Sequence, residues 1–497
     1  MRRSSHFTGV CLVFALALSA RAEEAKPATP EELERRLDEL EQQNHELRES
    51  VRDLQQQTDG ATAPAPSPAS SPEPSTPGTA GGALWSHPVG SGGGTLQLLD
   101  LSLDALAAVG GSTARDDEIE LLQGGGHDPR QRGFTLQQVE LSFQGAVDPY
   151  VTGEAHMVTF LDPEGETQFE LEEAFLKTIA LPFDLQEQGF QLEAGTFLTE
   201  FGRMNPTHPH AWDWQDQPFA FTRLFGEDGL RGPGLRLGWL VPLPWFAEIH
   251  AGVQNAHGEQ MVSFLGNEEV FEERSIGGRP FADRRVRSAE DFTYLVRLVN
   301  GVDFSDTISA QLGGSALFGP NNTGSSGDTQ IFGGDLVVKW VPLDAQRGWP
   351  FVRFQAEAVH RRYAASAFTG CFVDEPGCTT VFVPHKTLTD HGLYVQALYG
   401  FWPGWAAGVR YEYGSGTGNG VAFDDTTASV VATPRRLDPL RSDRHRVSPL
   451  LVFYPSHFAR LRLQYDYDRV NFTRHENEHS VWLGVEFLYG AHPAHSL

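Results

Sequence analysis

The fold class is set by the stretch Val481-Trp482-Leu483-Gly484-Val485-Glu486-Phe487, in which odd-numbered positions are apolar and even-numbered positions include Glu486. Successive side chains of a strand point to opposite faces, so this alternation predicts a strand with one apolar face. Residues 409–413 and 461–468 repeat the pattern, with apolar and aromatic residues alternating with charged or polar ones. Because a soluble β-sandwich also alternates, the period alone does not place the sheet in a membrane.

The lengths of the connections between strands favour a membrane barrel. Short turns containing proline lie at 147–149, 242–244, 402–404 and 454–456, and long polar loops lie between those hairpins. A strict alternation of short turns and long loops is typical of an outer-membrane barrel with periplasmic turns and extracellular loops. The long loops are expected at 106–132, 198–230, 257–288, 364–387 and 416–444.

Segments of about ten residues with this alternation recur sixteen times, and ten residues is the length that a tilted membrane strand needs. We predict an all-β fold, a transmembrane antiparallel β-barrel of about 16 strands over residues 95–497, preceded by a short α-helical coiled coil. An even number of strands places both ends of the barrel on the periplasmic side. The strands are expected at 95–105, 133–145, 149–160, 167–180, 189–197, 231–241, 245–256, 289–300, 307–318, 330–341, 351–363, 388–401, 405–415, 445–454, 457–468 and 478–490.

The composition agrees with a membrane β-barrel and argues against a nucleic-acid-binding protein. The chain has 38 Lys and Arg against 65 Asp and Glu, a net charge of −27, which argues against nucleic acid as a partner. It contains 33 Phe, 11 Tyr and 10 Trp, yet no run of about 20 apolar residues follows the N-terminal segment, so no transmembrane helix is predicted. We expect lipid of the bacterial outer membrane around the barrel and small polar solutes or metal ions inside it.

The N-terminal part is predicted to carry a signal peptide, a coiled coil and a linker. A short apolar run followed by Ala20-Arg21-Ala22 predicts a secretory signal over residues 1–22. Leucines at heptad spacing predict a periplasmic coiled coil over 31–57. Residues 58–94, rich in Pro, Ala, Ser and Gly, are predicted to be a linker.

The coiled coil implies a homo-oligomer. Asn44 at a core position leans towards a dimer, whereas porins favour trimers. We favour a trimer, and the sequence leaves the number open.

Two cysteines, Cys371 and Cys378, flank a six-residue gap that contains Pro and Gly in a polar loop. In an oxidising compartment this spacing predicts a disulfide that closes a small loop. A metal pair is the alternative, although no CxxC spacing supports it.

The polar face of each strand is expected to face the lumen. The first half of the barrel contributes mainly acidic residues and the second half mainly arginines, so one hypothesis is a transverse field that orients dipolar solutes. The alternative is salt bridging between strands that only solvates a wide lumen, and the sequence favours neither. The predicted pore-lining residues are Glu140, Glu154, Glu172, Glu248, Arg297, Arg353, Arg361, Arg410, Arg460 and Arg462.

The loop 198–230 contains the densest set of chemically versatile side chains. We predict that His208, His210, Trp212, Asp213 and Asp216 constrict the pore. Imidazole nitrogen and carboxylate oxygen are also ligands of Zn²⁺, so His208, His210 and Asp213 are candidate metal ligands. The lumen residues His156 and His250 would complete such a site if the loop folds inward. We favour the constriction, and Zn²⁺ is a candidate ligand rather than a required cofactor.

Catalytic motifs do not emerge from the sequence. It has no P-loop, no GxGxxG after a predicted strand and no GxSxG on a strand, so the chain is predicted not to be an enzyme. An outer-membrane hydrolase such as a phospholipase is the enzymatic alternative.

The order of signal, coiled coil, linker and barrel resembles porins with a periplasmic coiled coil, including the phosphate-selective porin O/P group. Glu173-Ala174-Phe175, Ala194-Gly195-Thr196-Phe197 and Phe201-Gly202 are similar to a strand-turn-strand segment of that group. This resemblance implies a channel for the diffusion of small polar or charged solutes.

A second resemblance rests on His208-Pro209-His210-Ala211-Trp212-Asp213, Asp216-Gln217-Pro218 and Gly490-Ala491-His492-Pro493-Ala494-His495. These motifs resemble bacterial zinc-regulated, TonB-dependent outer-membrane receptors, which implies a link to zinc or another metal. Such a receptor needs a plug domain and about 22 strands, so we expect diffusion rather than energised transport. A metal-uptake receptor and a barrel that tethers the envelope layers are the alternatives to a diffusion porin.

Overall fold

The computed structural model describes residues 86–89, 94–97, 99–163, 165–371, 380–424 and 429–490. The predicted signal peptide, the coiled coil, the rest of the predicted linker, Cys378 and the C-terminal histidine motif after Gly490 lie outside the described residues. In the range predicted to be a linker, β1 (Ser86–Val89) pairs antiparallel with β2 (Gly94–Gln97), which begins at the last residue of that range.

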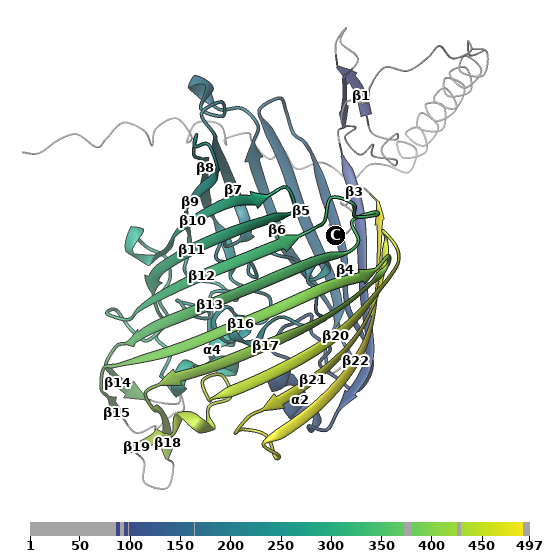
Figure 1. Cartoon of the computed structure of the whole chain (residues 1–497). Helices are drawn as coiled ribbons and strands as arrows, with labels where there is room; N and C mark the ends of the chain where they lie inside the picture. Colours follow the sequence, from purple (N-terminus) through teal and green to yellow (C-terminus); the bar gives the residue numbers. More distant parts are fainter. Residues whose placement is uncertain are drawn as a thin grey trace, which may run out of the picture. The chain divides into compact units, whose positions relative to one another are not determined.

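Sixteen antiparallel strands of the described chain form a closed barrel (Figure 1). Strands that are consecutive in the barrel sequence pair with each other, and β22 pairs with β3 to close the cylinder. This confirms the predicted fold class. The strands are β3 (Asp100–Ser112), β4 (Gly133–Ala146), β5 (Val151–Leu161), β6 (Thr167–Thr178), β7 (Phe190–Leu198), β8 (Arg231–Leu240), β9 (Phe246–Asn255), β10 (Phe292–Ser305), β11 (Ile308–Pro320), β12 (Asp328–Trp340), β13 (Phe351–Ala365), β16 (Lys386–Trp402), β17 (Trp405–Thr417), β20 (Arg444–Ser456), β21 (Ala459–Arg469) and β22 (Asn477–Gly490).

The alternation that predicts the strands separates the two faces of the wall. Along β22, Val481, Leu483 and Phe487 are exposed on the outside, whereas Trp482 and Glu486 are fully buried on the inside. Neighbouring β21 repeats this division, with leucines and tyrosines outside and charged residues inside. The exterior of the cylinder is therefore apolar and its interior polar.

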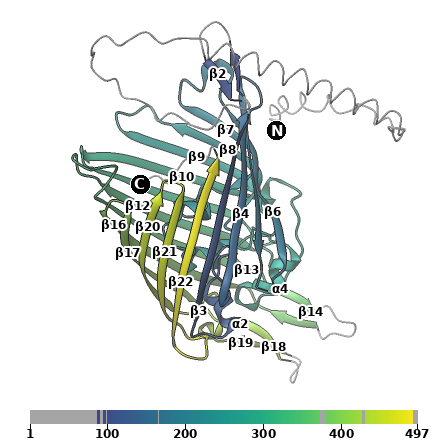
Figure 2. The same ribbon diagram turned by 90° about the vertical axis from the view of Figure 1, so that its right-hand side faces the viewer.

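Both ends of the barrel sequence lie at the same rim, because Gly490 pairs with Ser102 (Figure 2). The turns between paired strands, such as 241–245 and 403–404, lie at this rim, and the loops lie at the other. We call these the turn rim and the loop rim.

Two details differ from the sequence prediction. The first barrel strand begins at Asp100 rather than at 95 and continues through 107–112, because small residues without a strong apolar pattern still pair with β22. The alternation of short turns and long loops is also not strict. The loop-rim connections 162–166, 321–327 and 470–476 are short, and the turn-rim connection 179–189 is longer and contains a 3-10 turn.

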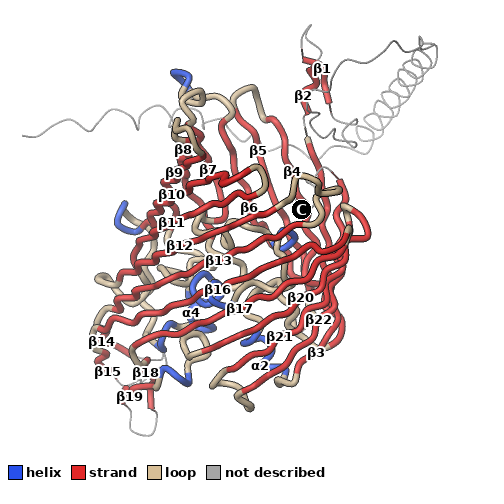
Figure 3. The backbone as a smooth tube through the Cα atoms, viewed as in Figure 1, coloured by secondary structure: helices blue, strands red, loops and turns tan. Residues whose placement is uncertain are grey.

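Shorter elements belong to the connections, and Figure 3 shows helices and irregular segments at the loop rim and within the barrel. None of the helices among the described residues is long and apolar enough to cross a membrane. These elements are α2 (Asp116–Leu122), η2 (Pro182–Asp184), η3 (Pro209–Ala211), α3 (Phe219–Phe225), α4 (Glu268–Arg274), η4 (Ile276–Gly278), η5 (Ala289–Asp291), β14 (Phe368–Cys371), β15 (Thr380–Val383), β18 (Gly420–Asp424), β19 (Ser429–Thr433) and η6 (Arg435–Leu437). Cys371 is disulfide-bonded, and its predicted pairing with Cys378 stays a prediction.

The main apolar core lies inside the barrel and is built around residues 199–230, which we call the lumen loop. Every residue of its helix α3 is buried. Aromatic residues of the loop, among them Phe201, Phe221 and Phe225, pack against inward residues of the wall such as Ile331 and Tyr394. Burial of about 25 cal/mol per Å² of apolar surface makes this packing a major contribution to holding the loop inside.

Candidate functional site

Arginines from one side of the barrel hold the backbone of the lumen loop. Arg460 on β21 donates to the carbonyl oxygens of His210 and Trp212, both at 2.8 Å, and Arg462 donates to that of Trp214 at 2.8 Å. Both guanidinium groups also contact the carboxylate of Glu486. We call the inner faces of β17, β20, β21 and β22 the arginine wall. Its inward arginines are Arg410, Arg444, Arg446, Arg460 and Arg462.

Asp216 is the acidic residue of the loop that this wall encloses. Its two carboxylate oxygens accept from Arg410 and Arg446, each at 2.5 Å, and Gln464 donates to it at 2.7 Å. Burial opposes ionisation, but Arg410 and Arg446 outweigh it and hold the pKa of the Asp216 carboxyl below its ordinary value. The loop is thus bound through a fully buried and fully paired charge.

A glycine in the arginine wall lets Gln215 of the lumen loop reach the backbone of the wall. Gln215 donates from its side-chain amide to the carbonyl oxygens of Arg462 and Trp482, at 3.1 and 3.0 Å. A Cβ at Gly484 would lie 2.1 Å from the side-chain oxygen of Gln215. The glycine inside the alternating stretch 481–487 therefore lets the loop approach the backbone of the wall.

The opposite side of the barrel holds the loop through histidines and carboxylates, which we call the histidine cluster. Its members are Asp104, Glu140, His156, Glu172, Glu173, His208 and His210. His208 of the loop contacts Glu172 through Nδ1 and Glu173 through Nε2, each at 2.9 Å. Glu140 lies 2.8 Å from His156 Nδ1 and 3.1 Å from His210 Nδ1. The inner faces of β3 to β6 that carry these wall residues are called the histidine wall.

Burial alone would disfavour a charged His208, but Glu172 and Glu140 outweigh burial and raise the pKa of this imidazole well above its ordinary value. A doubly protonated ring suits its two carboxylate partners. The side chains therefore form an imidazolium–carboxylate network.

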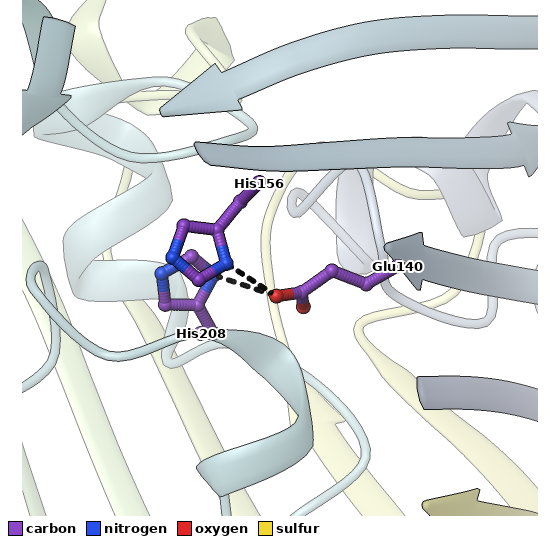
Figure 4. A group of neighbouring side chains, drawn as sticks. All are labelled: Glu140, His156 and His208. Atoms are coloured by element: carbon purple, nitrogen blue, oxygen red, sulfur yellow. Dashed lines mark hydrogen bonds and ion pairs between the residues drawn. The ribbon is translucent and has the colours of Figure 1, made fainter. Parts of the chain in front are cut away.

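The same geometry is compatible with a metal ion. Glu140, His156 and His208 each offer a ligand atom, and these atoms lie within 4.8 Å of one another. Figure 4 shows both imidazoles on one side of the Glu140 carboxylate. The rings of His156 and His208 lie 4.6 Å apart, and those of His208 and His210 lie 5.6 Å apart. Both oxygens of Asp104, 3.9 Å or more from His210 Nδ1, lack a hydrogen-bond partner among the described residues.

The structure divides the predicted metal ligands. It brings His208 and His210 together with the predicted His156, but it pairs Asp213 with Arg353. His250 instead lies 3.5 Å from Glu248. His210 belongs to the 3-10 turn η3 and meets Glu140 of β4, whereas Asp213 follows the extended Trp212 and meets Arg353 of β13.

The predicted pore-lining residues point inward, but most of them do not face open water. Arg297 pairs with Asp335 and Arg361 with Asp390, both between strands. Arg353, Arg410, Arg460 and Arg462 bind the lumen loop, and Glu140 and Glu172 belong to the histidine cluster. Glu248 and Glu154 keep the most exposure in this set, followed by Arg353. These contacts favour local salt bridges over a simple transverse field.

Sequence reasoning missed Glu173. Strict alternation would place it outside, because Glu172 points inside. A β-bulge opposite His156 and Met157 leaves Glu172 unpaired and turns both carboxylates inward. The two adjacent glutamates in a strand were the available signal.

Two cavities flank the lumen loop within the described part of the chain. The outer cavity, about 1020 Å³, lies at the loop rim and includes Arg223 of the loop. Its lining has nine acidic and four basic side chains among the described residues. The inner cavity, about 1060 Å³, lies at the turn rim and includes Arg203 of the loop and Lys339. Burial raises the pKa of the Asp228 carboxyl, in the wall of the outer cavity, to about 6.

The similarities of this chain to known proteins are distant. No family model matches the sequence. A protein of Aquifex aeolicus (strain VF5), described only as uncharacterized, is 27% identical over 420 residues, which cover 80% of either chain.

Solved outer-membrane barrels are similar at low identity. The anion-selective porin from Comamonas acidovorans is 9% identical, with 79% of this chain and 99% of that chain covered and a TM-score of 0.43. The outer-membrane channel DcaP of Acinetobacter baumannii is 12% identical, with 79% and 96% covered and a TM-score of 0.44. Pseudomonas putida OprB is 12% identical, with 79% and 94% covered and a TM-score of 0.43. Similarities of this size do not bear on function, so the resemblances to phosphate-selective porins and to zinc-regulated receptors stay predictions.

Proposed function

We propose that this protein is an outer-membrane channel for small polar solutes, with the lumen loop as its constriction. The observation that carries the proposal is a closed barrel with an apolar exterior and a polar interior, in which one charged loop lies between two cavities. An apolar exterior suits lipid, and a closed barrel satisfies the backbone hydrogen bonds that lipid cannot.

The charge of the outer cavity supports a preference for cations. Acidic residues predominate in its lining, and a cleft lined by one sign of charge concentrates the opposite ion. In the inner cavity the acidic Glu187 and Asp303 balance the basic Arg203 and Lys339, so the preference is set at the loop rim. We therefore propose that small cationic and polar solutes enter more readily than anions.

Planar lipid bilayers test this proposal. The purified full chain should give discrete conductance steps, and a KCl gradient should give a reversal potential on the cation-selective side. Arg285→Ala, a change at an exposed ion pair in a loop, is the matched control and should behave as wild type. The proposal would be contradicted if folded wild type and a folded variant whose lumen loop is released, such as Asp216→Asn, both gave no conductance.

A second candidate function is binding of a transition metal at the histidine cluster. It is favoured by the three ligand atoms of Glu140, His156 and His208, with His210 beside them. Zinc binding requires the imidazolium protons of the network to leave. Calorimetry with Zn²⁺ on the detergent-solubilised chain should therefore show proton release, and His208→Gln should abolish it. Equal binding by wild type and His208→Gln would reject this candidate.

A further inference from the structure

Three side chains from distant parts of the sequence meet at the outer cavity. His127 belongs to the connection between β3 and β4, Glu170 lies on β6, and Asp228 lies near the end of the lumen loop. Their ligand atoms all lie within 4.8 Å of one another. Glu170 and Asp228 line the outer cavity, so the group has access to solvent.

The ring of His127 is held with one nitrogen ready to bind a ligand. Its Nδ1 lies 3.3 Å from the carbonyl oxygen of Gln137. A carbonyl oxygen only accepts, so Nδ1 donates this bond, and in the neutral ring Nε2 then carries a lone pair. The side chain is 2% exposed, and Nε2 has no hydrogen-bond partner in the described part of the chain. A buried, oriented and unpartnered imidazole nitrogen is the arrangement that metal-binding histidines show.

The nearest atom to this nitrogen is itself an acceptor without a partner. Oδ1 of Asp228 lies 3.7 Å from Nε2 and lacks a hydrogen-bond donor among the described residues. The distance is too long for a direct hydrogen bond. Two lone pairs that face each other in a buried place are unfavourable unless a positive group lies between them.

The backbone is shaped to allow this approach. A Cβ at Gly126 would lie 2.0 Å from Oδ1 of Asp228, so only glycine lets the carboxylate reach its place. The other oxygen of Asp228 accepts from Gln260 at 3.2 Å, which orients the carboxylate. Gln260 also lies 3.4 Å from Glu170, whose carboxylate contacts Arg231. The ligand groups thus have supporting contacts of their own.

We infer that His127, Glu170 and Asp228 form a binding site for a divalent transition-metal cation in the wall of the outer cavity. Bonds of about 2.0–2.1 Å to a tetrahedral ion separate its ligand atoms by roughly 3.3 Å. The 3.7 Å between Nε2 and Oδ1 is close to that spacing. One imidazole and two carboxylates suit Zn²⁺ and similar ions better than Ca²⁺, which takes six to eight oxygens.

This site is separate from the histidine cluster, but both include glutamates of β6. Glu170 and Glu172 both contact Arg231, and alternate residues of a strand share a face about 7 Å apart. An ion at the outer cavity would therefore lie next to the histidine cluster along β6. The outer site does not require the proposed channel activity, because its ligands do not hold the loop to the arginine wall.

Cobalt binding to the full-length chain in detergent tests the inference. Co²⁺ reports nitrogen and oxygen coordination by visible absorption, and Zn²⁺ displaces it. Wild type should bind Co²⁺, whereas His127→Gln and Asp228→Asn should each weaken this binding at least tenfold. His250→Gln, a change at an inward histidine outside both clusters, is the control and should bind as wild type.

The histidine cluster is removed from the comparison by repeating the titrations in a His208→Gln background. Loss of binding on changing His127 in that background supports the outer site. Unchanged binding, or no Co²⁺ binding by folded wild type, would overturn it and leave a water or a proton between Nε2 and Oδ1. Heat-dependent gel mobility checks that each variant keeps the barrel.

Gly126→Ala provides a test that leaves all three ligands in place. The added methyl group displaces Asp228, so Co²⁺ affinity should fall at least tenfold while bilayer conductance persists. Unchanged Co²⁺ affinity in Gly126→Ala would count against this site, whereas wild type that binds Co²⁺ but gives no conductance would reject the proposed channel and keep the site.

Discussion

The arginine wall and the histidine wall bind the same loop with different chemistry. On the arginine wall, guanidinium groups donate to loop carbonyls and enclose Asp216, and acidic residues of the wall such as Glu486 and Asp468 balance their charge. On the histidine wall, His208 and His210 of the loop contact carboxylates of β4 and β6.

The difference lies in what can change the two contacts. Arginine stays charged at any physiological pH, and its planar group makes paired hydrogen bonds. Imidazole exchanges its protons for metals and loses its charge with pH. The arginine wall therefore provides permanent docking, whereas docking on the histidine wall depends on the ions present. Two changes test this division, and a third, away from both walls, tests the outer cavity.

The largest effect is expected from Asp216→Asn. It leaves Arg410 and Arg446 buried without their shared carboxylate, which costs about 3–5 kcal/mol. The loop should leave the arginine wall, and single-channel conductance should rise several-fold in planar bilayers. Asp283→Asn, at an exposed ion pair, is the matched control. A conductance equal to that of wild type would show that Asp216 does not hold the constriction.

A smaller effect is expected from the double variant His208→Gln and His210→Gln. Glutamine keeps part of the hydrogen bonding to Glu140, Glu172 and Glu173. Unlike arginine, a carboxylate that loses its cation can take up a proton, so the loss is about 1–2 kcal/mol. Conductance should rise less than in Asp216→Asn, with more frequent transitions between levels in single-channel records. A rise as large as that of Asp216→Asn would remove the distinction between the walls.

The smallest effect is expected from Glu259→Gln, which removes one charge from the outer cavity without touching the lumen loop's anchors. The cation preference should fall by less than about twofold at low salt and become indistinguishable from wild type near 1 M salt, where the screening length is about 3 Å. Glu187→Gln in the inner cavity is the control. Reversal potentials measure the cation preference of both variants. An equal change in the two would show that the outer cavity does not set this preference.

The strands were predictable because their signals are local. Alternation over about ten residues and proline-containing turns place the sixteen strands, and the longest stretches that escape this signal are the small residues of 107–112 and the end of β10 at 301–305. The residues of the lumen loop that contact the walls were recognisable from their types. Their partners were not, because Asp213 meets Arg353 and Asp216 meets Arg446 only after the barrel closes. The inward position of Glu173 depends on a bulge, which inserts an extra residue and so breaks the two-residue alternation of the strand.

The lumen loop starts and ends at residues that already pair across two adjacent strands, because Leu198 lies opposite Arg231. Everything between these two positions is an insertion into a single hairpin, and no strand register depends on its length. The interior can therefore change without a change in strand pairing. A different segment between Leu198 and Arg231, together with new partners for the inward side chains that now hold it, such as Arg410 and Glu172, would remodel the interior while the outward faces of the strands stay the same.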